Sequence, residues 1–418
     1  MTSVPPGSRA GEVTLKSGAV VRQSFLSRWF ALVFLSAFAS ELGSSLLVHF
    51  PGYLLDLGAN EVRIGLIVGV AGLATILVRP WAGRVMDLHS RRLVIRVGTL
   101  LVAVSTLAMG FIGHLGIQVV TARLFQGIGQ AITMTAFWTY IADRIPPENR
   151  AQGIALFGIS GLLPMGIAPA IGDGILTTGW GYQGLFIVAA SFAMVAFVLS
   201  LFLERSGVHV GATTTGFRSV LRSKALRPVW VATAFLSIAF TTTFIFIKTY
   251  VTTTGLNSVG PFFAAFALSA VVWRLAFGRV PDQVGPKRIV GPGLALYAAG
   301  LAIVGVVGGT GGLAVGGLIT GLGHGITYPV VLAIATMRAP AGDRGTVTAT
   351  FTAVFDLVLF SVAPILGLVI GAFGYPAMFL IVAIVVLIGV AWFYRWDHGE
   401  EDKLPAITES ATAPVPHL

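Results

Sequence analysis

Residues 79–87 read Arg-Pro-Trp-Ala-Gly-Arg-Val-Met-Asp, and residues 274–282 read Arg-Leu-Ala-Phe-Gly-Arg-Val-Pro-Asp. The two stretches share the same residue at five of the nine positions and lie 195 residues apart (274 − 79). Nearly the same offset relates Gln-Gly-Ile-Gly at 126–129 to Thr-Gly-Leu-Gly at 320–323. Recurrence at one spacing indicates a duplicated unit of roughly 200 residues, a plan known among membrane proteins.

The composition indicates that lipid is the solvent of this chain. Of its 418 residues, 55% are hydrophobic and 11% are charged, whereas a soluble domain carries about 25% charged residues. The apolar runs last about 20 residues, which favours membrane-spanning helices over strands. We therefore predict an all-α membrane protein with twelve transmembrane helices in two pseudo-symmetric six-helix bundles. The expected spans are 26–50, 62–85, 94–114, 117–141, 152–175, 182–203, 228–250, 259–279, 289–308, 311–336, 346–370 and 376–394.

The breaks between the apolar runs divide the chain into five parts. The expected parts are a cytoplasmic flexible tail (1–24), an N-terminal six-helix bundle (25–203), a cytoplasmic linker (204–227), a C-terminal six-helix bundle (228–395) and a disordered cytoplasmic tail (396–418).

Basic residues are concentrated in the breaks after the even-numbered spans, and Arg63 is an exception. Lys and Arg beside a span are retained on the cytoplasmic side. The pattern predicts a multi-pass protein of the cell (inner) membrane with both termini cytoplasmic. The net charge of +10 is then explained by topology and contact with anionic lipid, so we expect membrane lipid and no nucleic acid as a partner. The chain has no Cys, which excludes disulfides and thiolate-ligated metal centres; no cofactor and no metal site are expected.

Several motifs resemble those of the major facilitator superfamily, including the repeated Gly-x-x-x-Asp stretch and Arg123-Leu-Phe-Gln-Gly-Ile-Gly129. The stretch Gly166-Ile-Ala-Pro169-Ala-Ile-Gly172 resembles the antiporter motif of the family's fifth helix, although Ala168 and Asp173 replace two of its glycines. The form of the first repeat also resembles a bacterial proton-coupled efflux branch. The resemblance implies the major facilitator fold. Aspartates at these cytoplasmic helix ends can cap a helix N-terminus of the opposite bundle, so we expect a cytoplasmic gate made of Gly83, Asp87, Arg91, Arg92, Gly278, Asp282, Lys287 and Arg288. The alternative for its basic residues is that they serve membrane topology alone.

Charges inside a membrane are costly, so each is a candidate for function. The expected spans contain Glu41, Arg79, Arg123, Asp173, Lys248, Arg274 and Asp356. Glu41 and Asp356 are candidate proton sites, because a buried carboxyl can load and release a proton. The resemblance gives Arg123 a part in proton coupling, and an Arg can only modulate a neighbouring acid. The alternative for each is structural: a hydrogen-bonded packing acid, an ion pair of Asp356 with Lys248, or a helix-end anchor.

A substrate cavity is predicted from Glu41, Lys248, His324, Phe137, Trp138 and Phe244. Lys248 can bind an anionic group or extend its ammonium to the membrane surface. His324 can relay protons, since imidazole titrates near neutral pH, or serve as a packing residue. Phe244 precedes Lys248 by four residues, which places both on one face of a regular helix.

These features predict a secondary active transporter, not an enzyme, that exports a small molecule by alternating access, as a monomeric proton antiporter. The alternative is proton-coupled or facilitative uptake of a small polar or anionic metabolite. An intramembrane serine protease is a remote alternative, based on Gly158-Ile-Ser160-Gly161, because a serine nucleophile also needs a nearby base. The chain has no nucleotide-binding Walker motif.

Overall fold

The computed structural model describes residues 12–14, 20–22, 27–88, 90–145, 150–204, 217–278, 280–339 and 344–397. A short antiparallel hairpin, β1 (Glu12–Thr14) and β2 (Val20–Arg22), precedes the helices. The first half contains α1 (Arg28–Leu46), the short 3₁₀ turn η1 (Leu47–His49), α2 (Phe50–Asp56), α3 (Glu61–Leu88), α4 (Arg91–Met109), α5 (Ile117–Arg144), α6 (Arg150–Leu176) and α7 (Gly181–Leu201). The second half contains α8 (Phe217–Arg222), α9 (Arg227–Thr241), the π-helical turn η3 (Thr242–Phe246), α10 (Ile247–Thr253), α11 (Gly260–Phe277), α12 (Val280–Val284), α13 (Pro286–Val307), α14 (Gly309–Met337) and α15 (Arg344–Trp396).

The described helices confirm the all-α membrane fold. Nine of the helical stretches in the described ranges are long and apolar enough to cross a membrane. Helices also overlap every predicted span, and α15 covers the last two. Within α15, Gly374 has a φ of +79° and a ψ of 172°; glycine adopts positive φ without steric cost, so the chain can turn there from one helix into the next. The exact number of crossings stays a prediction.

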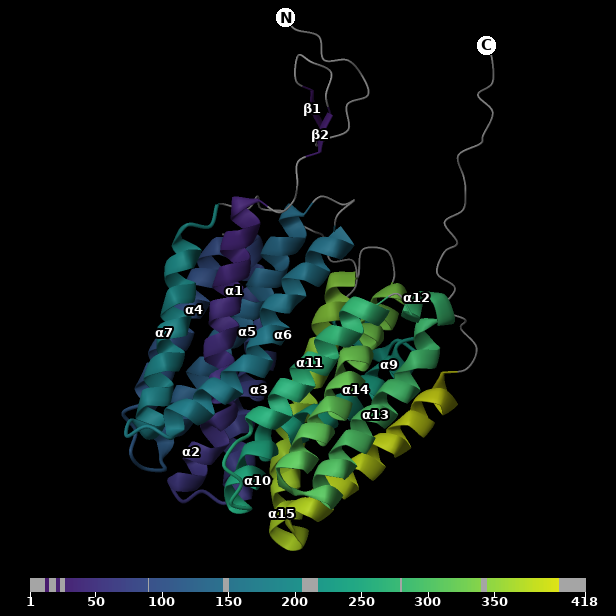
Figure 1. Ribbon diagram of the computed structural model, residues 1–418. Helices are drawn as coiled ribbons and strands as arrows, with labels where there is room; N and C mark the ends of the chain where they lie inside the picture. The colour runs from purple at the N-terminus through teal and green to yellow at the C-terminus, as the bar shows by residue number, and fades with distance from the viewer. Residues whose placement is uncertain are drawn as a thin grey trace, which may run out of the picture. The chain divides into compact units, whose positions relative to one another are not determined.

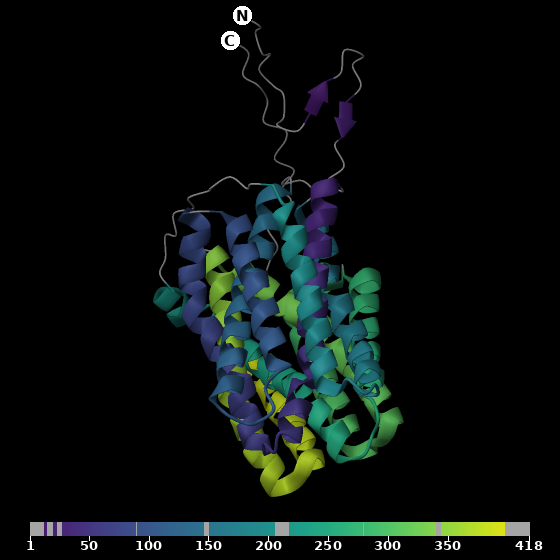
Figure 2. The ribbon, with the colours of Figure 1, turned by 90° about the vertical axis from the view of Figure 1, so that its left-hand side faces the viewer.

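The chain folds into two units, which we describe separately. The first comprises Met1–Gly211 and Lys248–Ala264, and the second comprises Ala212–Ile247 and Ala265–Leu418. In the first unit α1 packs against α6 and α7, α4 packs against α5 and α7, and α3 packs against α5. In the second unit α13 packs against α14 and α15, and α9 packs against α15. Figures 1 and 2 show long helices lying side by side within each unit.

The interface between α4 and α5 has a counterpart between α13 and α14. A Cβ on Gly98 would collide with the Thr133 hydroxyl, and a Cβ on Gly293 would collide with the Thr327 hydroxyl. The offsets of these pairs are 195 (293 − 98) and 194 (327 − 133). Each glycine therefore lets two helices of its own unit approach closely, and the duplication seen in the sequence is also a duplication of contacts.

At matching positions, a basic residue hydrogen-bonds the backbone just after α7 in the first unit and just after α15 in the second. In the first unit, Arg92 Nη1 donates to the Leu203 carbonyl at 3.3 Å. In the second, Lys287 Nζ donates to the Asp397 carbonyl at 2.6 Å. A cation at a helix C-terminus satisfies free carbonyls and interacts favourably with the helix dipole.

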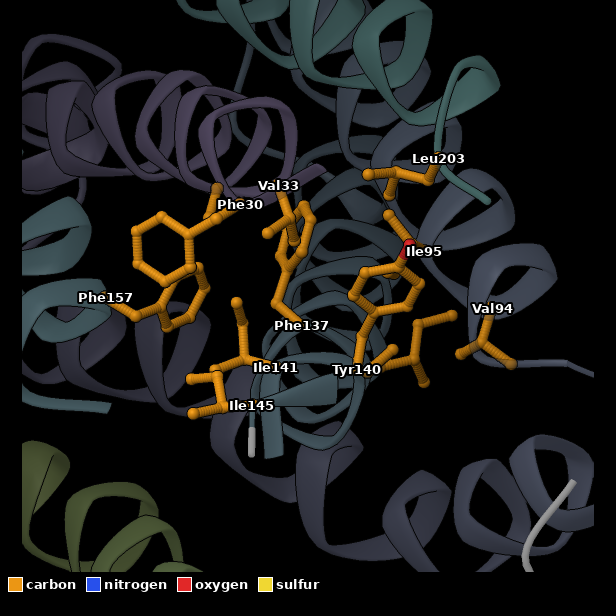
Figure 3. Packing of buried hydrophobic residues seen from close by; sticks show 13 residues of the cluster. Phe30, Val33, Val94, Ile95, Phe137, Tyr140, Ile141, Ile145, Phe157 and Leu203 are labelled. Atoms are coloured by element: carbon orange, nitrogen blue, oxygen red, sulfur yellow. The ribbon is translucent and has the colours of Figure 1, made fainter. Parts of the chain in front are cut away.

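The core of the first unit includes a cluster contributed by α1, α4, α5 and α6 (Figure 3). Phe137 and Tyr140 of α5 are completely buried in it, beside Val33 of α1 and Phe157 of α6. Phe137, which the sequence suggested as a cavity residue, thus has a packing position in this structure.

Candidate functional site

Glu41 of α1 belongs to a polar group that links α1 to α5. Gln130 Nε2 donates to Glu41 Oε2 at 3.1 Å, and Ser44 Oγ donates to Gln130 Oε1 at 2.6 Å. Ser44 lies three residues after Glu41 on α1, so both reach the same Gln130 side chain. The carboxylate is therefore held in place by a neutral amide, which can hydrogen-bond either protonation state of the acid.

Arg123 lies on α5 seven residues before Gln130, which is about 10 Å along a helix axis. Its Nη1 donates to Gln126 Oε1 at 2.7 Å. Its guanidinium lies over the Phe50 ring, 5.0 Å from the centroid. The structure thus fixes Arg123 through α5 itself and through an aromatic ring of α2. Its part in proton coupling stays a prediction.

A second polar group surrounds Asp173, near the end of α6, and it lies wholly within the first unit. Asp173 Oδ2 accepts hydrogen bonds from Ser258 Oγ at 2.6 Å and from the Gly260 backbone N–H at 2.9 Å. Its Oδ1 lies 3.6 Å from Lys248 Nζ and 3.8 Å from His49 Nδ1. Gly260 is the first residue of α11, so the carboxylate meets the positive end of that helix. We call these five residues the Asp173 cluster.

The antiporter-like residues of α6 position the histidine of this cluster. His49 is fully buried, and its Nε2 lies 3.0 Å from the Pro169 carbonyl. A Cβ at Gly172 would collide with the same imidazole ring. Gly166 is buried on the same helix. Pro169 therefore provides the polar contact of the His49 ring, and Gly172 provides the space in which that ring packs.

The ion-pair partner of Lys248 differs from the one that the sequence predicted. The ion pair that the structure describes for it is with Asp173 of α6, where the sequence had suggested Asp356. The lysine stem also packs against Gly52, where an added Cβ would lie 3.1 Å from Lys248 Cε. Both charged side chains of the pair are nearly buried, at 9% and 10% exposure, so each depends on the other for compensation.

The contacts described for Phe244 and for Lys248 involve different residues. Phe244 lies within the π-helical turn Thr242–Phe246, which ends two residues before Lys248. Phe244 stacks on Phe240 with ring centroids 4.1 Å apart and meets Phe266 edge-on at 5.7 Å. These partners belong to the second unit.

His324 lies in an aromatic cluster of the second unit. It is 5% exposed, and its ring centroid lies between 5.4 and 5.9 Å from those of four neighbours. These neighbours are Phe240, Phe266, Tyr297 and Tyr328.

Trp138 is 39% exposed and meets Phe157 edge-on, with ring centroids 5.0 Å apart, in the first unit. The substrate role of these residues stays a prediction. Asp356 is half-buried on α15.

The structure describes the surroundings of only some of the predicted gate residues. The side chains of Asp87 and Asp282, and the surroundings of Gly83, lie outside the described residues. Arg91 is buried at the start of α4, while Arg288 and Gly278 are exposed. Arg92 and Lys287 hydrogen-bond the backbone just after α7 and α15, as described above. Their role in a gate is untested.

Sequence reasoning missed the partners of the charged residues. Gln130 directly follows the quoted motif on α5, and its amide within an apolar span was the available signal. Ser258 lies in a break between two spans and carried no signal of its own. Within the described residues, no three or more His, Asp or Glu side chains lie close enough together to hold a metal ion.

Comparison with known proteins places these features in a family. The family model of the Major Facilitator Superfamily matches residues 24–358 and 259–417. The staphylopine export protein of Staphylococcus aureus is 24% identical over 352 residues, covering 80% of this chain and 87% of that protein. The uncharacterized MFS-type transporter YhhS of Escherichia coli is 27% identical over 389 residues, covering 90% of this chain and 94% of that protein.

Solved structures of the same fold are similar at lower identity. A mutant of the nucleoside transporter NupG superposes with a TM-score of 0.75 at 13% identity, covering 88% of this chain and all of that chain. A bacterial homologue of the human lysosomal transporter Spinster, in an inward-facing and occupied conformation, gives a TM-score of 0.72 at 14% identity, covering 88% and 96%. At such identities the likeness establishes the fold alone.

Proposed function

This chain belongs to the Major Facilitator Superfamily, and from that premise we propose that it exports a small molecule by alternating access in exchange for protons. Family membership makes the protein membrane-embedded and a carrier of small molecules rather than an enzyme. Export, proton exchange, the monomeric state and the inner-membrane location with cytoplasmic termini are parts of the proposal.

The observation that carries the proposal is the Glu41 group. An ionisable carboxyl in a membrane-spanning helix costs free energy of insertion, so such a residue is a candidate for function. Gln130 offers it an Nε2–H that can donate to the carboxylate or to the carbonyl oxygen of the protonated acid, so the amide pairs with either state. A site that tolerates both states is what a proton carrier requires.

Export as the direction of transport is supported by one relative, the staphylopine export protein of Staphylococcus aureus. The antiporter-like residues Pro169 and Gly172 also pack closely against His49 within the first unit. The protease alternative receives no support from Ser160, because its hydroxyl donates to the Phe157 carbonyl of its own helix at 2.7 Å.

The test uses the full chain in everted membrane vesicles with a fluorescent pH probe and a panel of candidate compounds, including staphylopine, which the name of one relative gives as its substrate. A transported compound should release protons from acidified vesicles while it accumulates inside them. Glu41→Gln should abolish this proton release, and Glu61→Gln, which changes a carboxyl at the start of α3, should retain it. Undiminished proton-driven transport by Glu41→Gln would reject the site, and substrate movement in the opposite direction would favour uptake.

A further inference from the structure

We propose that the second unit carries a binding site for one anionic phospholipid, formed where α8 and α9 pack against α15. An acyl chain lies in an apolar groove, and the phosphate lies on neighbouring basic side chains. The site is at the end of the unit that the proposed topology places on the cytoplasmic side. It depends neither on the direction of transport nor on proton exchange.

A groove of about 400 Å³ lies between the start of α9 and the end of α15. Its α9 wall includes Arg227, Trp230 and Phe235, and its α15 wall consists of Trp392 and Trp396. Phe235 meets Trp392 edge-on with ring centroids 6.3 Å apart, and Trp392 stacks on Trp396 at 5.8 Å. Tryptophan gathers where a membrane meets water, so this tryptophan groove suits the upper part of a lipid acyl chain.

A second cavity, of about 540 Å³, is lined by Arg218, Ser219, Arg222 and Ser223. We call it the basic pocket. Ser223 precedes Arg227 of the tryptophan groove by four residues, a stretch of chain that spans at most about 14 Å when fully extended. The two cavities are therefore close enough for one lipid to reach both.

The buried guanidinium of Arg338 ties the two cavities together. Its Nη1 donates to the Ala225 carbonyl at 3.1 Å, and its Nη2 donates to Asp397 Oδ2 at 3.0 Å. Ala225 lies between the two cavities in the sequence, and Asp397 directly follows Trp396. The basic segment is thereby held against the α15 wall of the groove.

The short helix α8 has the pattern of a helix that lies at a membrane surface. Val220 is buried, whereas Phe217 and Leu221 are 45% and 40% exposed. Arg218 and Arg222 are exposed as well. Residues four apart share a helix face, so an apolar face and a basic face lie side by side. In an interfacial helix the first meets acyl chains and the second meets headgroups.

The exposed side chains around both cavities identify the headgroup as anionic. Lys224, Arg227 and Arg395 are exposed, as are the two arginines of α8. Asp397 is only 4% exposed, and its charge is compensated within the unit by Arg338. Basic pockets beside membrane spans bind anionic headgroups. An anionic phospholipid has both the phosphate for the basic pocket and the hydrocarbon for the tryptophan groove.

The test measures lipid binding to the purified full chain by native mass spectrometry. Delipidated protein in a neutral detergent is titrated with phosphatidylglycerol or with phosphatidylcholine, and the first adduct gives an apparent Kd. One variant combines Arg222→Gln with Arg227→Gln. A second, Ala234→Phe, adds a ring to the lining of the groove without changing the charge. The control is Arg28→Gln, which removes an exposed cation of the first unit.

The wild type should bind phosphatidylglycerol more tightly than phosphatidylcholine. A basic residue near an anionic headgroup contributes about fivefold in affinity, so the double variant should lose about 25-fold, while Arg28→Gln should bind as the wild type does. Ala234→Phe should weaken the binding of both lipids, because the acyl chain loses its groove. Quenching of tryptophan fluorescence in the wild type should be stronger with phosphatidylglycerol brominated on its acyl chains than with brominated phosphatidylcholine.

Three results would overturn the proposal. Equal affinity of the wild type for the two lipids would remove the selectivity, and a double variant that binds like Arg28→Gln would remove the basic pocket from the site. Unchanged binding by Ala234→Phe, together with equal quenching by the two brominated lipids, would place the lipid elsewhere. Glycerol phosphate that binds as tightly as the lipid would assign the pocket to a soluble anion and reject the lipid site. No transport enters these measurements, so their outcome is independent of the proposed function.

Discussion

At the scale of the residue, Glu204 and Asp397 occupy corresponding places just after α7 and α15 but differ in burial. Glu204 pairs with Arg144 at 2.9 Å, and its side chain is 70% exposed. Asp397 pairs with Arg338 at 3.0 Å and with Lys287 at 3.5 Å, and its side chain is 4% exposed. Surface ion pairs contribute little, whereas removing one partner of a buried pair leaves an uncompensated charge.

We therefore expect Asp397→Asn to destabilise the protein by about 3–5 kcal/mol and Glu204→Gln by about 1 kcal/mol or less. The measurement is the apparent unfolding midpoint of each purified variant in the same detergent. Equal midpoints for the two variants would contradict the difference in burial.

Single residues also show where sequence reasoning succeeds. The intramembrane charges were identified because a charge among apolar residues is visible in any window of sequence. Their partners were not, because Ser258 lies 85 residues from Asp173 and Gln130 lies 89 residues from Glu41. An uncharged hydrogen-bonding residue carries no comparable signal until the helices are packed.

At the scale of the element, α6 positions the side chains of His49 and Lys248 that pack against it. The Pro169 carbonyl lies within hydrogen-bond distance of His49, and Gly172 leaves room for the imidazole ring. Asp173 forms an ion pair with Lys248. The resemblance drew attention to Pro169 and Gly172, and it marked Asp173 as a departure. The structure shows that this departure is the acidic centre of the cluster.

Gly172→Ala should destabilise the protein by about 1–3 kcal/mol, since a methyl group would be forced into the His49 ring. Gly174→Ala is the matched control on the same helix, because among the described residues no atom beyond its chain neighbours and the adjacent backbone of α6 lies within 4 Å of the added Cβ. Thermal unfolding followed by size-exclusion fluorescence would compare them. A loss of stability in Gly174→Ala as large as in Gly172→Ala would assign the effect to loss of glycine rather than to the contact.

At the scale of the whole molecule, the distribution of basic residues is the basis of the proposed topology. It puts the break after the seventh span outside the cell and the linker before that span inside. Asn257 and Ser219 are exposed positions in these two places, and the absence of natural Cys makes each a clean reporter.

Asn257→Cys in intact cells is expected to react with a membrane-impermeant maleimide, because the topology places it outside. Ser219→Cys should react only after the membrane is permeabilised. Mass-tag shifts on gels give the labelled fraction, and the reverse pattern would invert the predicted orientation of both termini.

The sequence by itself determined the membrane environment, the helical class and the duplication, because hydrophobic length and an internal repeat are properties of the chain in linear order. It also identified the charged candidates. Tertiary structure alone decided which side chains meet: Glu41 with Gln130, Lys248 with Asp173, and Phe137 with the hydrophobic core. The physical reason is that hydrogen bonds and ion pairs form between atoms a few ångströms apart, and helix packing sets those distances independently of separation along the chain.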